Sequence, residues 1–71
     1  RDYAVSPNGK LIAFVVHGEI FVKENKKGKS KSVNISNSPF RDLNPQWLSD
    51  STLIFTSDRN GQYDIYLVKS D

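Results

Sequence analysis

The chain has 71 residues, 37% of them hydrophobic and 25% charged, and it contains no cysteine. A chain of this length buries only about 60% of its unfolded surface, so it is too short for two independent domains. The lack of cysteine excludes disulfides, cysteine-ligated zinc and cysteine nucleophiles. The net charge of +2 is small, and no apolar run approaches the roughly 18 residues of a membrane span. We therefore expect neither a nucleic-acid partner nor a membrane partner.

The first half of the chain reads as short strands separated by turns. Residues 11–16 form a continuous apolar run, which predicts an inner strand buried on both faces. His17-Gly18 then links this run to residues 19–23, and such an X-Gly pair favours a tight hairpin with positive φ at its tip. Residues 32–36 alternate between polar and apolar side chains, which predicts a strand at a sheet edge with one face in water.

The second half repeats this order, with strands expected at residues 45–48, 52–56 and 64–68. Phe14 and Phe55 take matching places 41 residues apart, and Ile20 and Ile65 take matching places 45 residues apart. A period of 40 to 45 residues with four short strands is typical of β-propeller blades.

Counting strands along the whole chain gives seven. The sequence therefore predicts an all-β chain of β-propeller blades: one four-stranded antiparallel blade over residues 2–36 and three strands of a second over residues 44–69. A propeller has about four to eight blades, so two blades cannot close a ring. We expect a fragment of a larger propeller, or a unit that pairs with copies of itself.

Two segments carry a resemblance to a known family. Ser6-Pro7-Asn8-Gly9-Lys10-Leu11-Ile12-Ala13-Phe14 resembles the S-P-D-G-K-x-I-A-F motif of the TolB-like, or PD40, β-propeller repeat, a WD40-like repeat. Residues 56–66 resemble the S-D-R-x-G-x-x-D-I-Y continuation of that repeat. Within this superfamily, residues 1–7 and 17–22 are similar to a propeller segment of tricorn-like serine peptidases. Asn8 departs from the usual aspartate, and the turn at residues 48–51 lacks both proline and glycine.

The motif residues have a local structural logic of their own. Pro7 fixes its φ, Asn8 tolerates left-handed backbone and Gly9 accepts positive φ, so the chain can reverse within a few residues. In the later loop, polar side chains can satisfy loop backbone groups and glycine relieves the reversal. We therefore predict structural turn roles for Ser6, Pro7, Asn8, Gly9, Asp58, Arg59 and Gly61.

The sequence offers little for catalysis or for a cofactor. His17 is the only histidine, and it is expected at a hairpin tip, where a solvent-exposed turn residue is the simplest interpretation. No G-x-S-x-G and no glycine-rich phosphate loop is present. Five lysines gather within residues 23–31, and without interleaved aromatic residues they indicate a solvated hairpin tip. The sequence predicts no catalytic residue, no cofactor and no metal site.

The aromatic residues allow two interpretations. They could form a ligand platform, but strand positions favour burial between blades. This set comprises Tyr3, Phe14, Trp47, Phe55, Tyr63 and Tyr66.

The resemblance implies a non-catalytic propeller portion that binds or channels peptides towards a peptidase site elsewhere in a tricorn-like parent. Two alternatives stay open: a TolB-like propeller that docks partner proteins, and a two-blade unit that associates with itself. A peptide or protein partner is expected in each case. Both periplasmic and cytoplasmic proteins carry such repeats, and we expect a periplasmic location.

Overall fold

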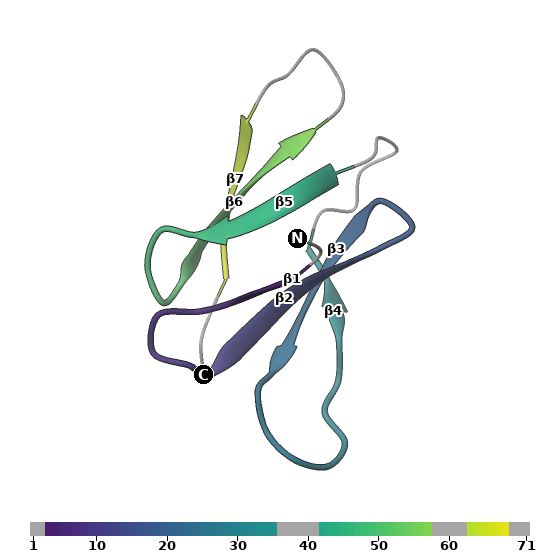
Figure 1. Cartoon of the computed structure of the whole chain (residues 1–71), viewed down its shortest axis with the longest axis vertical. Coiled ribbons are helices and arrows are strands. Elements are labelled where there is room, and N and C mark those ends of the chain that lie inside the picture. Colours follow the sequence, from purple (N-terminus) through teal and green to yellow (C-terminus); the bar gives the residue numbers. More distant parts are fainter. Residues whose placement is uncertain (1–2, 36–41, 58–62, 69–71) are drawn as a thin grey trace.

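The computed structural model describes residues 3–35, 42–57 and 63–68, which form strands and turns without a helix. The first antiparallel sheet has the order β1 (Tyr3–Val5), β2 (Leu11–Val16), β3 (Glu19–Glu24) and β4 (Val33–Asn34). The second antiparallel sheet has the order β5 (Asp42–Trp47), β6 (Thr52–Ser57) and β7 (Tyr63–Leu67). The all-β prediction is confirmed, and each sheet is a simple up-and-down meander (Figure 1).

The apolar run of the first sheet becomes its inner strand, β2, between β1 and β3. Leu11 and Ala13 are buried, but Val16 is 41% exposed and the remaining side chains of this strand are half-buried. The prediction of burial on both faces is therefore wrong within the described chain, because a second sheet covers only one face of β2. The predicted edge strand, β4, does lie at the edge of its sheet.

The hairpin between β2 and β3 has the predicted tight tip. Val16 pairs with Glu19, so His17 and Gly18 alone form the link. Both have positive φ, 50° and 80° respectively. Two consecutive left-handed residues match the right-handed twist of the flanking strands, which is why this link favours an X-Gly pair.

The turn between β1 and β2 is held by side chains as well as backbone. The carbonyl of Ser6 accepts a hydrogen bond from the N–H of Gly9 at 2.8 Å, and Gly9 has a φ of 77°. Ser6 Oγ accepts from the N–H of Leu11 at 3.0 Å and donates to Asn8 Oδ1 at 2.8 Å. Asn8 Oδ1 also accepts from the N–H of Lys10 at 3.0 Å. The residues of the S-P-N-G motif thus close the turn with their own polar groups.

The corresponding turn between β5 and β6 is one residue shorter. The first turn is closed by the N–H of Ser6 and the carbonyl of Leu11, and the second by the N–H of Leu48 and the carbonyl of Thr52, both at 2.9 Å. Between Leu48 and Thr52 no residue has positive φ. This turn therefore does not need the glycine of the first.

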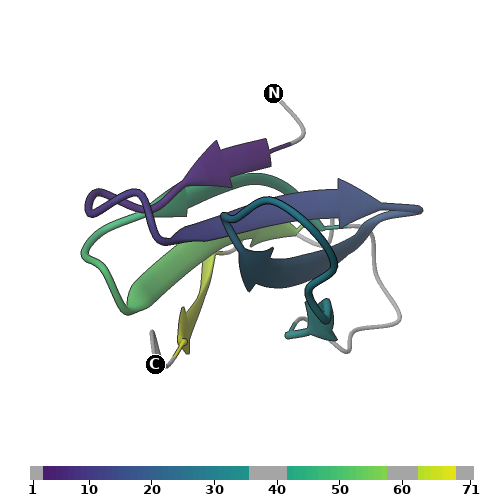
Figure 2. The ribbon, with the colours of Figure 1, turned by 90° about the horizontal axis from the view of Figure 1, so that it is seen from below.

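The core lies between the two sheets, because each sheet turns one apolar face towards the other. The first sheet contributes Leu11, Ala13, Ile20 and Val22, and the second contributes Leu53, Phe55 and Val68. β5 lies against β1, β2 and β3, so the two sheets meet along its length (Figures 1 and 2). Trp47 packs on this core, and its indole N–H donates to the carbonyl of Ala4 at 3.0 Å.

Phe14 and Phe55 occupy equivalent places in successive sheets, as their 41-residue spacing predicts. The first turn ends at Leu11 and the second at Thr52, whose carbonyls accept the closing hydrogen bonds. The next residues, Ile12 in β2 and Leu53 in β6, are therefore equivalent. Two residues later stand Phe14 and Phe55. Leu53 and Phe55 point towards the first sheet and are 0% and 1% exposed, whereas Ile12 and Phe14 point away from the second sheet and stay half-buried.

Strand pairing corrects the 45-residue spacing predicted between Ile20 and Ile65. Val22 pairs with Ala13, and Ile65 pairs with Ile54, which is the counterpart of Ala13 at the 41-residue spacing. Ile65 therefore takes the place of Val22, a spacing of 43 residues, because cross-strand hydrogen bonds rather than residue similarity set the register. The shift of two residues leaves Ile65 on the same face.

Candidate functional site

An open cleft of about 650 Å³ lies where the edges of the two sheets meet, and we call it the seam cleft. Its walls come from β1, β5 and β6, and its lining residues are Tyr3, Ala4, Val5, Asn44, Pro45, Gln46, Ile54, Phe55 and Thr56. β1 and β5 are the edge strands of their sheets. An edge strand can accept a further extended chain through its backbone. The cleft is therefore placed where an extended peptide could lie beside both sheets.

The wall formed by β5 is shaped by a local irregularity. The pairing of β5 with β6 shifts between Leu43 and Gln46, and Asn44 has a φ of 58°. Asparagine tolerates this left-handed conformation better than most residues. The buried ring of Pro45 follows, without an N–H for a ladder bond. The bulge leaves the side chains of Asn44 and Gln46 exposed at the cleft.

The seam cleft combines amide groups with apolar side chains. The amides of Asn44 and Gln46 each provide donors and an acceptor, which is the set needed to bind peptide groups. The exposed apolar side chain of Val5 and the ring of Tyr3 offer contact area beside them. The described residues that line this cleft include no His, Cys, Asp, Glu, Lys or Arg.

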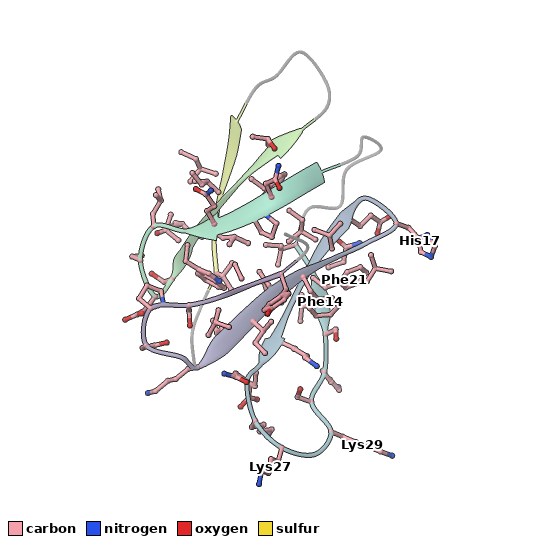
Figure 3. All side chains as sticks on the ribbon, in the orientation of Figure 1. Phe14, His17, Phe21, Lys27 and Lys29 are labelled. Atoms are coloured by element: carbon pink, nitrogen blue, oxygen red, sulfur yellow. The ribbon has the colours of Figure 1, made fainter. Side chains whose placement is uncertain are left out.

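A second cleft, of about 560 Å³, lies beneath the lysine-rich loop between β3 and β4. The apolar residues that line it are Leu11, Val22, Val33, Ile35, Leu67 and Val68, and the lysines that line it are Lys23, Lys26, Lys29 and Lys31. The loop extends from the first sheet, with Lys27 and Lys29 at its far end (Figure 3). All five lysines of residues 23–31 are exposed, as predicted for a solvated tip. Lys26 and Glu24 form an exposed ion pair at 3.8 Å.

The residues singled out in the sequence do not gather at one site. Residues 6–9 form the turn before β2, and His17 stands exposed at the opposite end of that strand (Figure 3). Asp58, Arg59 and Gly61 lie outside the described residues.

The aromatic residues divide between the two interpretations. Phe55 is buried and Trp47 packs on the core, so the prediction of burial holds for them. Within the described residues Tyr3 is 49% exposed, and Phe14 is half-buried and stacks on Phe21 at 5.7 Å on the outer face of the first sheet, so their burial between blades stays a prediction. The side chains of Tyr63 and Tyr66 lie outside the description.

Sequence reasoning missed Asn44 and Gln46. The Asn44-Pro45 pair is a signal of irregular backbone, because asparagine before proline favours a turn or bulge. Gln46 carried no such signal, since its position at the cleft depends on Tyr3 and Ala4, far away in the sequence.

Within residues 3–35, 42–57 and 63–68, no group of three His, Cys, Asp or Glu side chains could hold a metal ion. The same part of the chain contains no helix long and apolar enough to cross a membrane. Comparison with family models, characterised proteins and solved structures finds no match for this chain.

Proposed function

We propose that this chain is a pair of β-propeller-type blades that serves as a non-catalytic scaffold for an extended peptide or protein segment, as in the propeller of a tricorn-like serine peptidase. The observation that carries the proposal is the seam cleft between two edge strands, lined by the amides of Asn44 and Gln46. Backbone pairing with an edge strand supplies affinity that does not depend on peptide sequence, as a scaffold that channels varied peptides requires.

The stacking of the two sheets supports the blade assignment. The inner face of the first sheet packs against the face of the second sheet that carries Leu53 and Phe55. Leu53 and Phe55 are equivalent to Ile12 and Phe14, which lie on the outer face of the first sheet. The front of one sheet therefore meets the back of the next, as in a head-to-tail repeat array. A two-sheet sandwich related by two-fold symmetry would instead bring equivalent faces together.

A peptide titration followed at Trp47 tests the proposal. Trp47 is the only tryptophan, and its indole N–H bonds to Ala4, which lines the seam cleft. The probe is acetyl-(Thr-Val)3-amide, and the control is acetyl-(Pro)6-amide, whose six residues have no backbone N–H. We expect saturable shifts of the indole signal with the first peptide only. Equal shifts with both peptides, or none, would contradict strand addition in the cleft.

A substitution in the cleft wall tests whether the peptide binds at this cleft. Replacing Gln46 by alanine removes one amide from the wall, and the loss of a hydrogen bond worth about 1 kcal/mol weakens binding about fivefold. Lys27→Ala is the control, because Lys27 lies at the tip of the lysine-rich loop (Figure 3). Equal affinity of the wild-type chain and the Gln46 variant would place any bound peptide elsewhere.

A further inference from the structure

The strongest surface feature besides the seam cleft is a pair of faces with apolar side chains that neither sheet of the described chain covers. The outer face of the first sheet carries Tyr3, Val5, Ile12, Phe14 and Phe21, and Lys23 Nζ lies over the ring of Phe14, 5.8 Å from its centroid. The outer face of the second sheet carries Ile54, Ile65 and Leu67. The exposed fractions are 49% for Tyr3, 44% for Val5, 65% for Ile65 and 83% for Leu67.

These two faces are counterparts of the two faces that already pack together inside the chain. Phe14 on the outer face of the first sheet corresponds to Phe55, which is 1% exposed beneath the first sheet. Ile65 on the outer face of the second sheet corresponds to Val22, which is 5% exposed beneath the second sheet. The internal contact is therefore a template for joining the two open faces to each other.

We infer that a second copy of this chain stacks head to tail on the first, with the outer face of its second sheet (Ile54, Ile65, Leu67) against the outer face of the first sheet (Tyr3, Val5, Ile12, Phe14, Phe21). The apolar content of both faces supplies the driving force, because their burial removes several large side chains from water. This inference uses the same stacked repeat as the proposed function. The two faces share Tyr3, Val5 and Ile54 with the lining of the seam cleft, so the variants below change other residues.

The polarity of the contact distinguishes it from an ordinary dimer. The joined faces differ, so each copy keeps one face of each kind open after the first contact forms. Further copies then add until a ring closes. Propellers contain about four to eight blades, which corresponds to two to four copies of a two-sheet chain.

Two blocking variants test this polarity. Phe14→Glu places a charge on the outer face of the first sheet, and Ile65→Lys together with Leu67→Lys does so on the outer face of the second. Leu48→Lys is the matched control, because Leu48 is a 62% exposed leucine in the turn between β5 and β6. Circular dichroism and Trp47 fluorescence verify that each variant is folded.

Sedimentation equilibrium of the 71-residue chain gives the decisive masses. The wild-type chain and the Leu48 control are expected to rise above the 8.0 kDa monomer mass as concentration increases. Each blocked variant is expected to stay at the monomer mass. Their equimolar mixture is expected to form a species of twice that mass and no larger one, because only one complementary pair of open faces remains.

Other outcomes overturn the inference. A wild-type chain that remains monomeric up to millimolar concentration excludes the contact. If one blocked variant still dimerises by itself, equivalent faces meet each other and the head-to-tail polarity is wrong. If a blocked variant fails to fold, concentration-dependent NMR shifts of the wild-type chain decide: both Phe14 and Ile65 signals must move while Leu48 stays fixed, and movement of one alone contradicts the inference.

The sedimentation experiment and the peptide titration can each give a negative result without the other, so a failure of this inference is distinguishable from a failure of the proposed function. Loss of assembly in the blocked variants with unchanged shifts of the Trp47 indole by the peptide would leave the scaffold function in place. Assembly without peptide binding would remove the seam cleft as a site and keep the stacked contact.

Discussion

Phe14 and Phe55 stand at equivalent places of two successive sheets, yet one is half-buried on an outer face and the other is almost fully enclosed. Both strands lie in the middle of their sheets, although Phe14 pairs with Tyr3 and Phe55 stands opposite the bulge of β5. The difference in burial follows from what lies above each face. The contribution of such a side chain to the free energy of unfolding therefore depends on the neighbouring sheet rather than on its own sheet.

The largest expected effect is the loss of stability when each of the two phenylalanines is replaced by alanine. Phe55→Ala removes a buried ring and leaves a cavity, which costs about 3–5 kcal/mol of unfolding free energy. Phe14→Ala loses partial burial and the stacking on Phe21, about 1 kcal/mol. A small domain has little stability to spare, so the Phe55 variant is expected to lose cooperative unfolding. Urea denaturation at micromolar concentration is expected to show a cooperative transition for Phe14→Ala and none for Phe55→Ala, and equal losses of stability in the two variants would contradict the comparison.

The next effect concerns the two turns. Ser6 is 3% exposed and its hydroxyl bonds to both Asn8 and the N–H of Leu11. Ser6→Ala leaves a buried donor without its partner and is expected to cost about 1–3 kcal/mol. Ser49 in the second turn is exposed and accepts one bond, from Ser51 at 3.3 Å.

Ser49→Ala is the matched control and is expected to change stability by less than about 0.5 kcal/mol. Thermal unfolding monitored by circular dichroism compares the two alanine variants. A larger loss in the Ser49 variant would reverse the assignment of which turn depends on a side chain.

A smaller effect separates backbone strain from packing at Gly9. An added Cβ at Gly9 would meet no atom within 4 Å, but the φ of 77° is left-handed. Gly9→Ala is therefore expected to cost about 1 kcal/mol through strain alone. Gly9→Asn should lose less, because asparagine tolerates this conformation. Urea midpoints of the two variants provide the measurement, and an equal loss in both would indicate a steric cause instead.

The smallest effect explains why this chain has asparagine where the similar motif has aspartate. The backbone N–H of Asn8 donates to Asp50 Oδ1 at 2.8 Å, so the carboxylate of Asp50 already lies beside residue 8. A second carboxylate there would repel it. A double-mutant cycle of Asn8→Asp and Asp50→Asn is expected to show an unfavourable coupling of about 0.5 kcal/mol at low salt.

Salt provides the control for this cycle. Screening at high ionic strength should reduce the coupling, since the groups are exposed. A coupling that is favourable, or that does not respond to salt, would contradict the repulsion.

Local features of the fold were predictable because their causes are local. His17 and Gly18 determine their hairpin by backbone conformation, and residues 6–9 close their turn through their own polar groups. The covered face of β2 was not predictable, since a continuous apolar run carries no alternation that distinguishes one face from the other.

The candidate site could not be predicted from the sequence to the same extent. The seam cleft joins β1 to β5, so its existence depends on how two sheets pack and not on a motif. The left-handed Asn44 that shapes one wall shows in the sequence only as a residue before proline. The expected start of a strand at Pro45 was three residues late, because β5 continues through its bulge from Asp42.

The tight tip at His17 and Gly18 has a consequence for the order in which the chain folds during synthesis. A two-residue link closes within microseconds, so the β2–β3 hairpin can form while later residues are still being added. The bond from Trp47 to Ala4 spans 43 residues and belongs to the slow, non-local part of folding. Until β6 emerges, Ala13, Ile20 and Val22 face water. The nascent first sheet therefore exposes an aggregation-prone apolar face until Leu53 and Phe55 are synthesised and pack against it.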